Sequence, residues 1–345
     1  MRRRPIVPVL LIGATAMAAT MLTSCSVFGT ADDERLAKDI AEQQFPGQLE
    51  LIDARNLWPA QGGSEITFAI VGDADAVVRL RIDSDEADGS GRCDGTSCAA
   101  ALTEKVTRAR ELASETRALL DSFDECGHPV VGLNEQASIP WVAASVTNEN
   151  VATVLAELTS CAEQWRDTAA ARGIVLAPDR TRLGVNIVDL DTAAKLPDAD
   201  SDLPSLIRLS FGDRTAALTH DAYLSASLPV TVGEPVASMR IVMPFDQGQE
   251  YESRVIPNVE KWLNANNLDL GISQAGMLGV TELEPGTVDR IHGYVVVCDP
   301  PPQGKQCIGD HAVGVVTDLD GNPTGEFTLY RDLRDGTGVL RLPTE

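Results

Sequence analysis

The chain has 345 residues and a formal net charge of −23, with 51 acidic residues against 28 basic ones. This charge repels nucleic acid and anionic lipid surfaces, so we expect no nucleic-acid partner. Hydrophobic residues make up 43% of the chain and the acidic residues are spread along it, which is typical of a folded body and excludes a disordered one.

The amino terminus has the pattern of an export signal. Three arginines at positions 2–4 form a basic start, and residues 6–21 are apolar and uncharged. The sequence Leu22-Thr23-Ser24-Cys25 follows, with a Leu three residues before the Cys. Residues 1–25 resemble the signal peptide and lipobox of bacterial membrane lipoproteins, which signal peptidase II cleaves before the Cys. Arg outnumbers Lys 23 to 5 and Ala is abundant, as is typical of actinobacterial proteins.

The resemblance implies that Cys25 becomes the first residue of the mature chain, with diacylglycerol on its sulfur and a fatty acid such as palmitate on its amine. Several acyl chains on one residue give firm membrane anchoring. The alternatives are an ordinary secretory signal and a transmembrane anchor. The apolar run is short and rich in small residues for a membrane span, and Leu22 stands where an ordinary cleavage site prefers a small residue.

The expected mature chain is a soluble body on a short lipid tether. Removal of residues 1–24 takes away three arginines, so its formal charge becomes −26. Charged residues interrupt every later apolar segment well before about 18 residues, which predicts no membrane span. Residues 26–30 reach at most about 17 Å when extended, so the body is expected to lie close to the membrane on its extracytoplasmic face.

The first part of the body is predicted to be a helix, an antiparallel meander and a long helix. Thr30 is a plausible N-cap, followed by acidic residues in the first turn of a helix. Residues 97–123 carry a helical stripe of mostly apolar residues, and between the two helices three strands are expected, over residues 49–55, 65–71 and 77–82.

The middle of the chain is predicted to continue with a strand, a helix and a strand. The helix has an apolar stripe from Val151 to Trp165, with Thr147 or Asn148 as its cap. The strands are expected over residues 138–146 and 183–190, with shorter strands near residues 206–211 and 216–225.

A later block echoes this order. Both blocks have a Trp late in the helix, Trp165 and Trp262, and both have Gly-Ile and Leu-Gly-Val further on, although the spacing differs. The pattern predicts a strand over residues 239–244, a helix over 249–266, a strand over 276–283, and then a meander over 291–298, 312–317 and 325–330.

These elements predict an α+β fold, with mixed or antiparallel sheets, packed helices and two related β-α-β blocks. Two Pro-punctuated connectors, residues 195–204 and 228–235, are candidate boundaries, and the restart of the pattern favours the second. The expected organisation is a signal peptide (1–24), a lipid-anchored tether (25–30), a disulfide-containing α+β domain (31–232) and a second α+β domain (236–345).

Six cysteines follow Cys25, and an even number in an exported chain indicates three disulfides. A continuous helix after Cys98 places it about 40 Å from Cys126, far beyond disulfide reach, so neither Cys93 nor Cys98 is expected to pair with Cys126. The sequence has no Cys-x-x-Cys pair, which disfavours a redox or metal role. The predicted pairs are Cys93 with Cys98, Cys126 with Cys161, and Cys298 with Cys307.

No motif predicts a catalytic site, a metal site or a cofactor. Residues 271–275, Gly-Ile-Ser-Gln-Ala, are weakly similar to a G-x-S-x-G nucleophile elbow, but a helix is expected before them and a strand after them, the reverse of that motif. Asp221 could orient His220 as a base, but neighbours on a strand point to opposite faces. A surface pair is therefore the favoured interpretation of these two residues. The four histidines, which lack zinc-site spacing, are His128, His220, His292 and His311.

Three acidic clusters raise the possibility of calcium binding. Residues 83–89 have the wrong spacing and no closing Glu, and the aspartates between residues 198 and 202 lack the Gly and Glu of a calcium loop. Residues 318–322 fit a tight turn better. Solvated loop residues are therefore the favoured interpretation of all three.

The sequence favours a non-catalytic lipoprotein that binds or helps to assemble another envelope component, with the membrane as a partner through Cys25. Two alternatives stay open. A solute-binding lipoprotein of a transporter would show a deep cleft, and a hydrolase with a dispersed site would show converging Ser, His and acidic side chains. An exposed apolar patch would favour a partner protein.

Overall fold

The computed structural model has an α+β fold of helices, mixed and antiparallel sheets, and three disulfides. Cys25 and the predicted signal peptide lie outside the residues that it describes. No described helix is long and apolar enough to cross a membrane. The described residues are 30–343, apart from 60–61, 85–91, 94–95, 135, 137, 178–179, 199–201, 232–236, 278–281 and 301–305.

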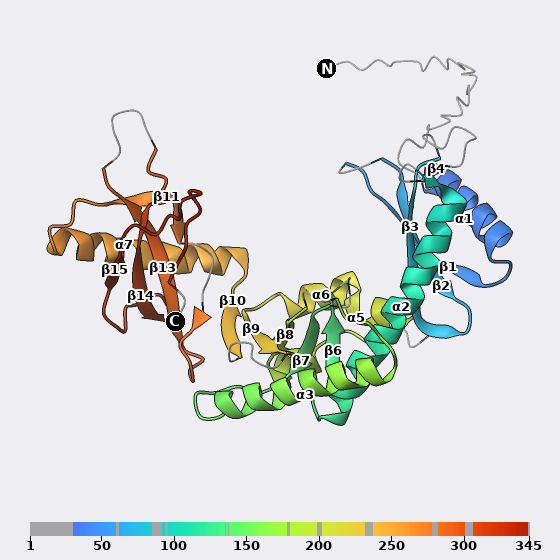
Figure 1. Cartoon of the computed structure of the whole chain (residues 1–345), viewed down its shortest axis with the longest axis horizontal. Helices are drawn as coiled ribbons and strands as arrows, with labels where there is room; N and C mark the ends of the chain where they lie inside the picture. Colours follow the sequence, from blue (N-terminus) through green and yellow to red (C-terminus); the bar gives the residue numbers. More distant parts are fainter. Residues whose placement is uncertain are drawn as a thin grey trace, which may run out of the picture.

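The N-terminal unit, residues 30–113, pairs a small sheet with two helices (Figure 1). Three of its strands form an antiparallel meander in the order β1-β2-β3, and β4 and β5 form a separate pair. Inward side chains such as Phe68 and Leu80 share a core with α1 and with the first part of α2. The elements are α1 (Ala31–Gln44), β1 (Leu49–Asn56), β2 (Ser64–Ile70), β3 (Asp73–Ile82), β4 (Arg92–Cys93) and β5 (Thr96–Ser97).

The long helix α2 (Cys98–Glu125) belongs to two hydrophobic cores. Ser97 caps it by accepting a hydrogen bond from the Ala100 N–H at 3.2 Å. Leu102, on the first half, is buried in the core of the N-terminal unit, whereas Leu119, on the second half, is buried in the core of the rest of the chain. The sequence stripe correctly predicted one continuous helix.

The remainder, residues 118–343, is here called the sheet body, and a ten-stranded sheet runs through it. All neighbouring strands are antiparallel except β7 and β8, which are parallel and joined by α3. The strands are β6 (Val130–Leu133), β7 (Pro140–Ala143), β8 (Arg182–Val188), β9 (Tyr223–Pro229), β10 (Ser238–Val242), β11 (Gly271–Met277), β12 (Glu282–Leu283), β13 (Arg290–Cys298), β14 (His311–Asp318) and β15 (Thr328–Tyr330).

Helices bury apolar side chains against this sheet. The stripe from Val151 to Trp165 lies in the same core as the sheet strands, and so does a stripe on α7. The N-cap position of α3 is Asn150 and not Thr147 or Asn148, and its side chain makes no capping bond. The Asn150 Oδ1 instead accepts a hydrogen bond from the Thr147 N–H, before the helix, at 2.7 Å. The helices are α3 (Val151–Ala171), α4 (Leu190–Ala194), α5 (Ser205–Ser210), α6 (Gly212–Leu218) and α7 (Phe245–Ala265).

The short strands predicted near residues 206–211 and 216–225 were wrong for the most part. Residues 205–210 form helix α5, with Leu206 and Ser210 buried one turn apart, and α6 occupies residues 212–218 before β9 begins at Tyr223. A short apolar run has too few residues to distinguish helical from strand periodicity, so packing on the sheet decided the outcome.

Two strand-helix-strand blocks are present but pair their strands differently. In the second block, the strand after the helix is residues 271–277 and not the expected 276–283, so residues 271–275 lie within a strand. In the first block, β7 and β8 are parallel neighbours. In the second, β10 pairs antiparallel with the short strand β12, while β11 pairs with β13. Strands β9 and β10 pair directly on either side of residues 232–236, which lie outside the described part, so the domain boundary there stays a prediction.

The three predicted disulfides are confirmed. Cys93–Cys98 closes the loop that leads into α2, and Cys126–Cys161 joins the end of α2 to the middle of α3. Cys298–Cys307 staples the connection between β13 and β14. Two of the bonds therefore close short loops, and Cys126–Cys161 links two helices.

Candidate functional site

The start of α1 is fixed to the sheet of the N-terminal unit by Asp33. Asp33 is 5% exposed, and its carboxylate accepts hydrogen bonds from the Ser64 hydroxyl at 2.6 Å and from the Ser84 N–H at 2.7 Å. The Thr30 hydroxyl does not accept a capping bond; it donates to the Glu34 carboxylate at 2.6 Å. These two hydrogen bonds fix the first turn of α1 beside the start of β2 and the end of β3.

The hairpin between β1 and β2 begins at this same point. Asn56 pairs with Ser64, and the next bond runs from the Leu57 N–H to the Gly63 carbonyl at 3.0 Å. The Trp58 N–H donates to the Asn56 side chain at 2.7 Å, and the Trp58 side chain is 62% exposed. A largely exposed aromatic residue thus lies two residues beyond the last ladder pair.

Gly63 permits this hairpin to close. Its φ of +76° suits glycine, and a Cβ there would lie 2.3 Å from the carbonyl oxygen of Ile82 on β3. The hairpin and the end of β3 are therefore packed backbone against backbone.

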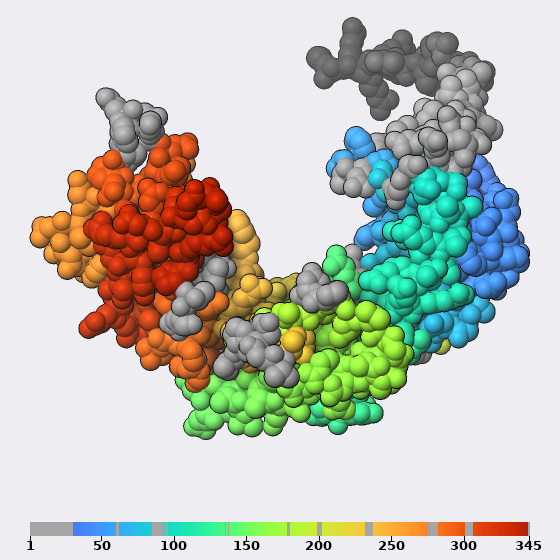
Figure 2. All heavy atoms as spheres, viewed as in Figure 1, coloured from blue at the N-terminus to red at the C-terminus, as the bar shows by residue number. Residues whose placement is uncertain are grey.

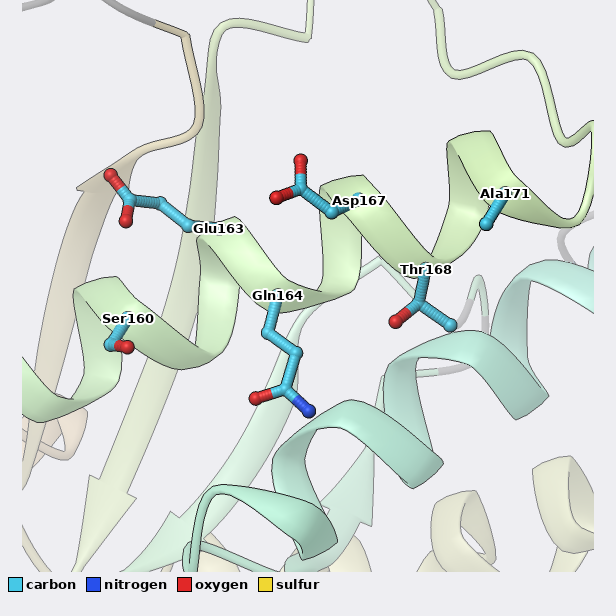
Figure 3. Close-up of a pocket in the computed structure, with 6 residues that line it drawn as sticks. All are labelled: Ser160, Glu163, Gln164, Asp167, Thr168 and Ala171. Carbon is cyan, nitrogen blue, oxygen red and sulfur yellow. The ribbon is translucent and has the colours of Figure 1, made fainter.

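A groove of about 440 Å³ follows one side of α3 (Figure 3). Figure 3 shows Gln164 and Thr168 pointing towards α2 and Asp167 pointing away from it, so its carboxylates do not converge. Gln164 donates to Glu125 on α2 at 2.6 Å. The lining residues, four of which are exposed, are Ser160, Glu163, Gln164, Asp167, Thr168 and Ala171. The two carboxylates of this open groove, Glu163 and Asp167, therefore do not form an acid–base pair.

Ser273 and His311 lie in one sheet but on opposite faces. Ile272 pairs with Val297 and Val297 with His311, which places His311 on the face of Ile272, whereas Ser273 points to the other face. The Ser273 hydroxyl donates to the Cys307 carbonyl at 3.3 Å. The weak similarity to a nucleophile elbow therefore has no partner base at His311.

His311 itself is 3% exposed and joins two segments. Its Nδ1 accepts the Asp332 N–H at 3.0 Å, and its Nε2 lies 3.5 Å from the Asp299 carboxylate. The other histidines are scattered, as expected: His128 contacts Glu157 at 3.1 Å, and the His292 ring lies 4.9 Å from the Tyr294 ring. His220 is exposed.

The acidic segment 318–322 forms the predicted turn. The Asp318 carboxylate accepts hydrogen bonds from the Asn322 side chain at 2.9 Å and from the backbone N–H groups of Asp320 and Asn322. The Asn322 side chain is the main cause that lowers the pKa of Asp318 below its ordinary value. Of the other two clusters, residues 85–89 and 199–201 lie outside the described part. Among described residues, no group of three or more potential ligands could hold a metal ion.

Comparisons with protein families, with curated proteins and with solved structures give no match for this chain. The role of Asp33 has no signal in the sequence, because an acidic residue in a first helical turn is ordinarily a solvated partner of the helix dipole. The predicted antiparallel meander, with strands over residues 49–55 and 65–71, includes the hairpin that carries Trp58, but not the exposure of Trp58. The signal for the turn is the Trp-Pro pair followed by two adjacent glycines, Gly62 and Gly63, between the two predicted strands.

Proposed function

We propose that the protein is a lipoprotein anchored through Cys25 on the extracytoplasmic face of the cytoplasmic membrane, where it binds or helps to assemble another envelope component. The observation that carries this proposal is the cysteine pairing. Three disulfides account for six of the seven cysteines and leave Cys25, the residue that ends the lipobox pattern.

The disulfides support an oxidising compartment, because cytoplasmic thiols are kept reduced in most organisms. The basic and apolar segment before Cys25 supports export. The start of α1 supports a tether, because the chain leaves a fixed point at Asp33, eight residues after Cys25.

A binding role is favoured over catalysis by the placement of the reactive side chains described above. Figure 2 shows the molecule hollowed between the N-terminal unit, in blue, and the orange and red carboxy-terminal part, with green and yellow segments as the floor. A partner in this hollow could contact the N-terminal unit and the carboxy-terminal part at the same time. The formal charge of −26 after removal of residues 1–24 favours a neutral or basic partner.

Cell fractionation of Cys25→Ser in an actinobacterial host tests the anchor. The wild-type chain is expected in the membrane fraction, and Cys25→Ser in the soluble or secreted fraction. The matched control is Cys93→Ser with Cys98→Ser, which also loses cysteines but keeps the lipobox, and it is expected to stay with the membrane. Equal membrane retention of Cys25→Ser and wild type would refute the proposal.

A further inference from the structure

Trp58 differs from the other three tryptophans in its exposure. Its side chain is 62% exposed, whereas Trp141 and Trp165 are 5% and 1% exposed. Trp262 is half-buried, and its ring stacks on Phe327 with the centroids 5.5 Å apart. An exposed indole is costly in water and is characteristic of a surface that meets an apolar partner.

A short chain of contacts places Trp58 beside the start of α1. Asp33 binds the Ser64 hydroxyl at 2.6 Å, Ser64 pairs with Asn56 across the hairpin, and Asn56 accepts the Trp58 N–H at 2.7 Å. Trp58 therefore lies at the end of the N-terminal unit from which the chain continues back towards Cys25. The segment 26–30 between them is at most about 17 Å long.

Charges of both signs lie around this end, where the carboxylates of Asp33, Glu34 and Asp83 accompany the arginines. Arg55 pairs with Glu65 at 2.9 Å, and Arg35 pairs with Asp32 at 2.6 Å. Arg81 donates to the Gly62 carbonyl in the hairpin loop at 3.4 Å. Arginines near a Trp suit a membrane interface, because their apolar stems can lie along the lipid while the guanidinium groups reach phosphates.

We propose that Trp58 is a second membrane contact, which inserts its indole into the lipid interface beside the anchor at Cys25. The inference rests on the proposed lipid anchor, since the net charge of the body is too negative for adhesion to lipid without one. The indole joins an apolar ring to an N–H group, and this is why Trp is enriched at membrane interfaces. The lipid at Cys25 and the Trp58 side chain would then be two contacts between the body and the membrane. Two contacts would orient the body, so that the curved surface of Figure 2 faces a fixed direction.

Tryptophan quenching by lipid tests this contact, using the full lipidated chain reconstituted into phosphatidylcholine vesicles with or without brominated acyl chains. Bromine quenches only fluorophores that reach the lipid. We expect partial quenching of the wild-type emission, from Trp58, and loss of that quenching in Trp58→Phe. The three remaining tryptophans lie in the sheet body and report no contact.

The matched control is Val175→Trp in the Trp58→Phe background, because Val175 is 90% exposed and lies in the sheet body after α3. This variant is expected to show no quenching. Wild-type protein that floats with the vesicles and is not quenched, or quenching that persists in Trp58→Phe, would overturn the contact and leave the anchor intact. Wild-type protein that does not float would instead refute the anchor, and the inference would fall with it.

Discussion

The N-terminal unit and the sheet body both pack helices on a sheet, but they differ in how the paired strands are connected along the chain. In the N-terminal unit, three successive strands form a meander, so each strand pairs with its neighbour in sequence. In the sheet body, β7 and β8 pair across a whole helix, and β10 and β12 pair across α7 and β11. The small sheet thus pairs only strands that are neighbours in sequence, whereas the large one adds pairings between distant segments.

Helix α2 is the element that joins the two regions. Its first half completes one core and its second half the other, while Val77 on β3 also reaches the core of the sheet body. Because both cores pack on one continuous helix, anchoring the N-terminal unit would also constrain the sheet body.

The largest expected effect comes from truncating one leucine in each half of α2. Leu102 and Leu119 are 0% and 2% exposed, so Leu102→Ala and Leu119→Ala should each lower the free energy of unfolding by about 2–5 kcal/mol. Hydrogen exchange should show that Leu102→Ala weakens β1–β3 and that Leu119→Ala weakens the strands of the sheet body. Equal loss of protection in both regions from either variant would contradict two separate cores.

Removing disulfides sharpens the comparison. Cys126–Cys161 closes a sequence separation of 35 in the sheet body, and Cys93–Cys98 closes only 5 in the N-terminal unit. From the entropy of the closed loop, replacing both cysteines by Ala should cost about 4 kcal/mol for the first pair and about 2 kcal/mol for the second. Denaturant unfolding measures both, and the reverse order would argue against a loop-entropy origin.

An ion pair between α2 and β3 should contribute less to the free energy of unfolding. Arg117 on α2 contacts Asp73 at 2.7 Å and Asp75 at 3.1 Å at the start of β3, and the hydrogen bond to Asp73 raises the pKa of Arg117. Since the Arg117 side chain is 40% exposed, Arg117→Met should cost about 1 kcal/mol or less. The difference from wild type in thermal unfolding should shrink in 1 M salt, and a salt-independent loss would point to packing instead.

The smallest effect is a local pH dependence near the carboxy terminus. Hydrogen bonds from the Thr337 hydroxyl and backbone, and from Arg341, lower the pKa of Asp335 from 3.8 to about 2. Because the folded pKa is depressed, the stabilisation is present above the ordinary pKa and is lost as the pH falls from about 4 towards 2. An NMR titration should show the Thr337 and Val339 amides shifting near pH 2, with no such step in Asp335→Asn. A midpoint near 4 in wild type would contradict these bonds.

Much of the fold could be predicted from the sequence because its signals are local. The apolar stripe of α2 is long enough to distinguish a helix, and the length of that helix excludes the wrong pairings of Cys126. The prediction of a strand near residues 206–211 was wrong, because Leu206, Ile207 and Leu209 fit a short strand as well as a helix. Only the sheet on which they pack decides between the two.

The candidate site was less accessible to sequence reasoning. Asp33 gains its role from Ser64 and Ser84, which are 31 and 51 residues away, so no local pattern marks it. The exposure of Trp58 likewise depends on how the hairpin closes at Gly63 against Ile82. Long-range packing, and not residue type, creates both features.

The intact mass of the chain extracted from membranes, alkylated with and without prior reduction, tests the central claim most directly. The account predicts a chain that begins at Cys25 and carries diacylglycerol. It also predicts no alkylation before reduction, and alkylation of only the cysteines of the three disulfides after it. A chain that retains residues 1–24, or one in which Cys25 is also alkylated, would contradict it.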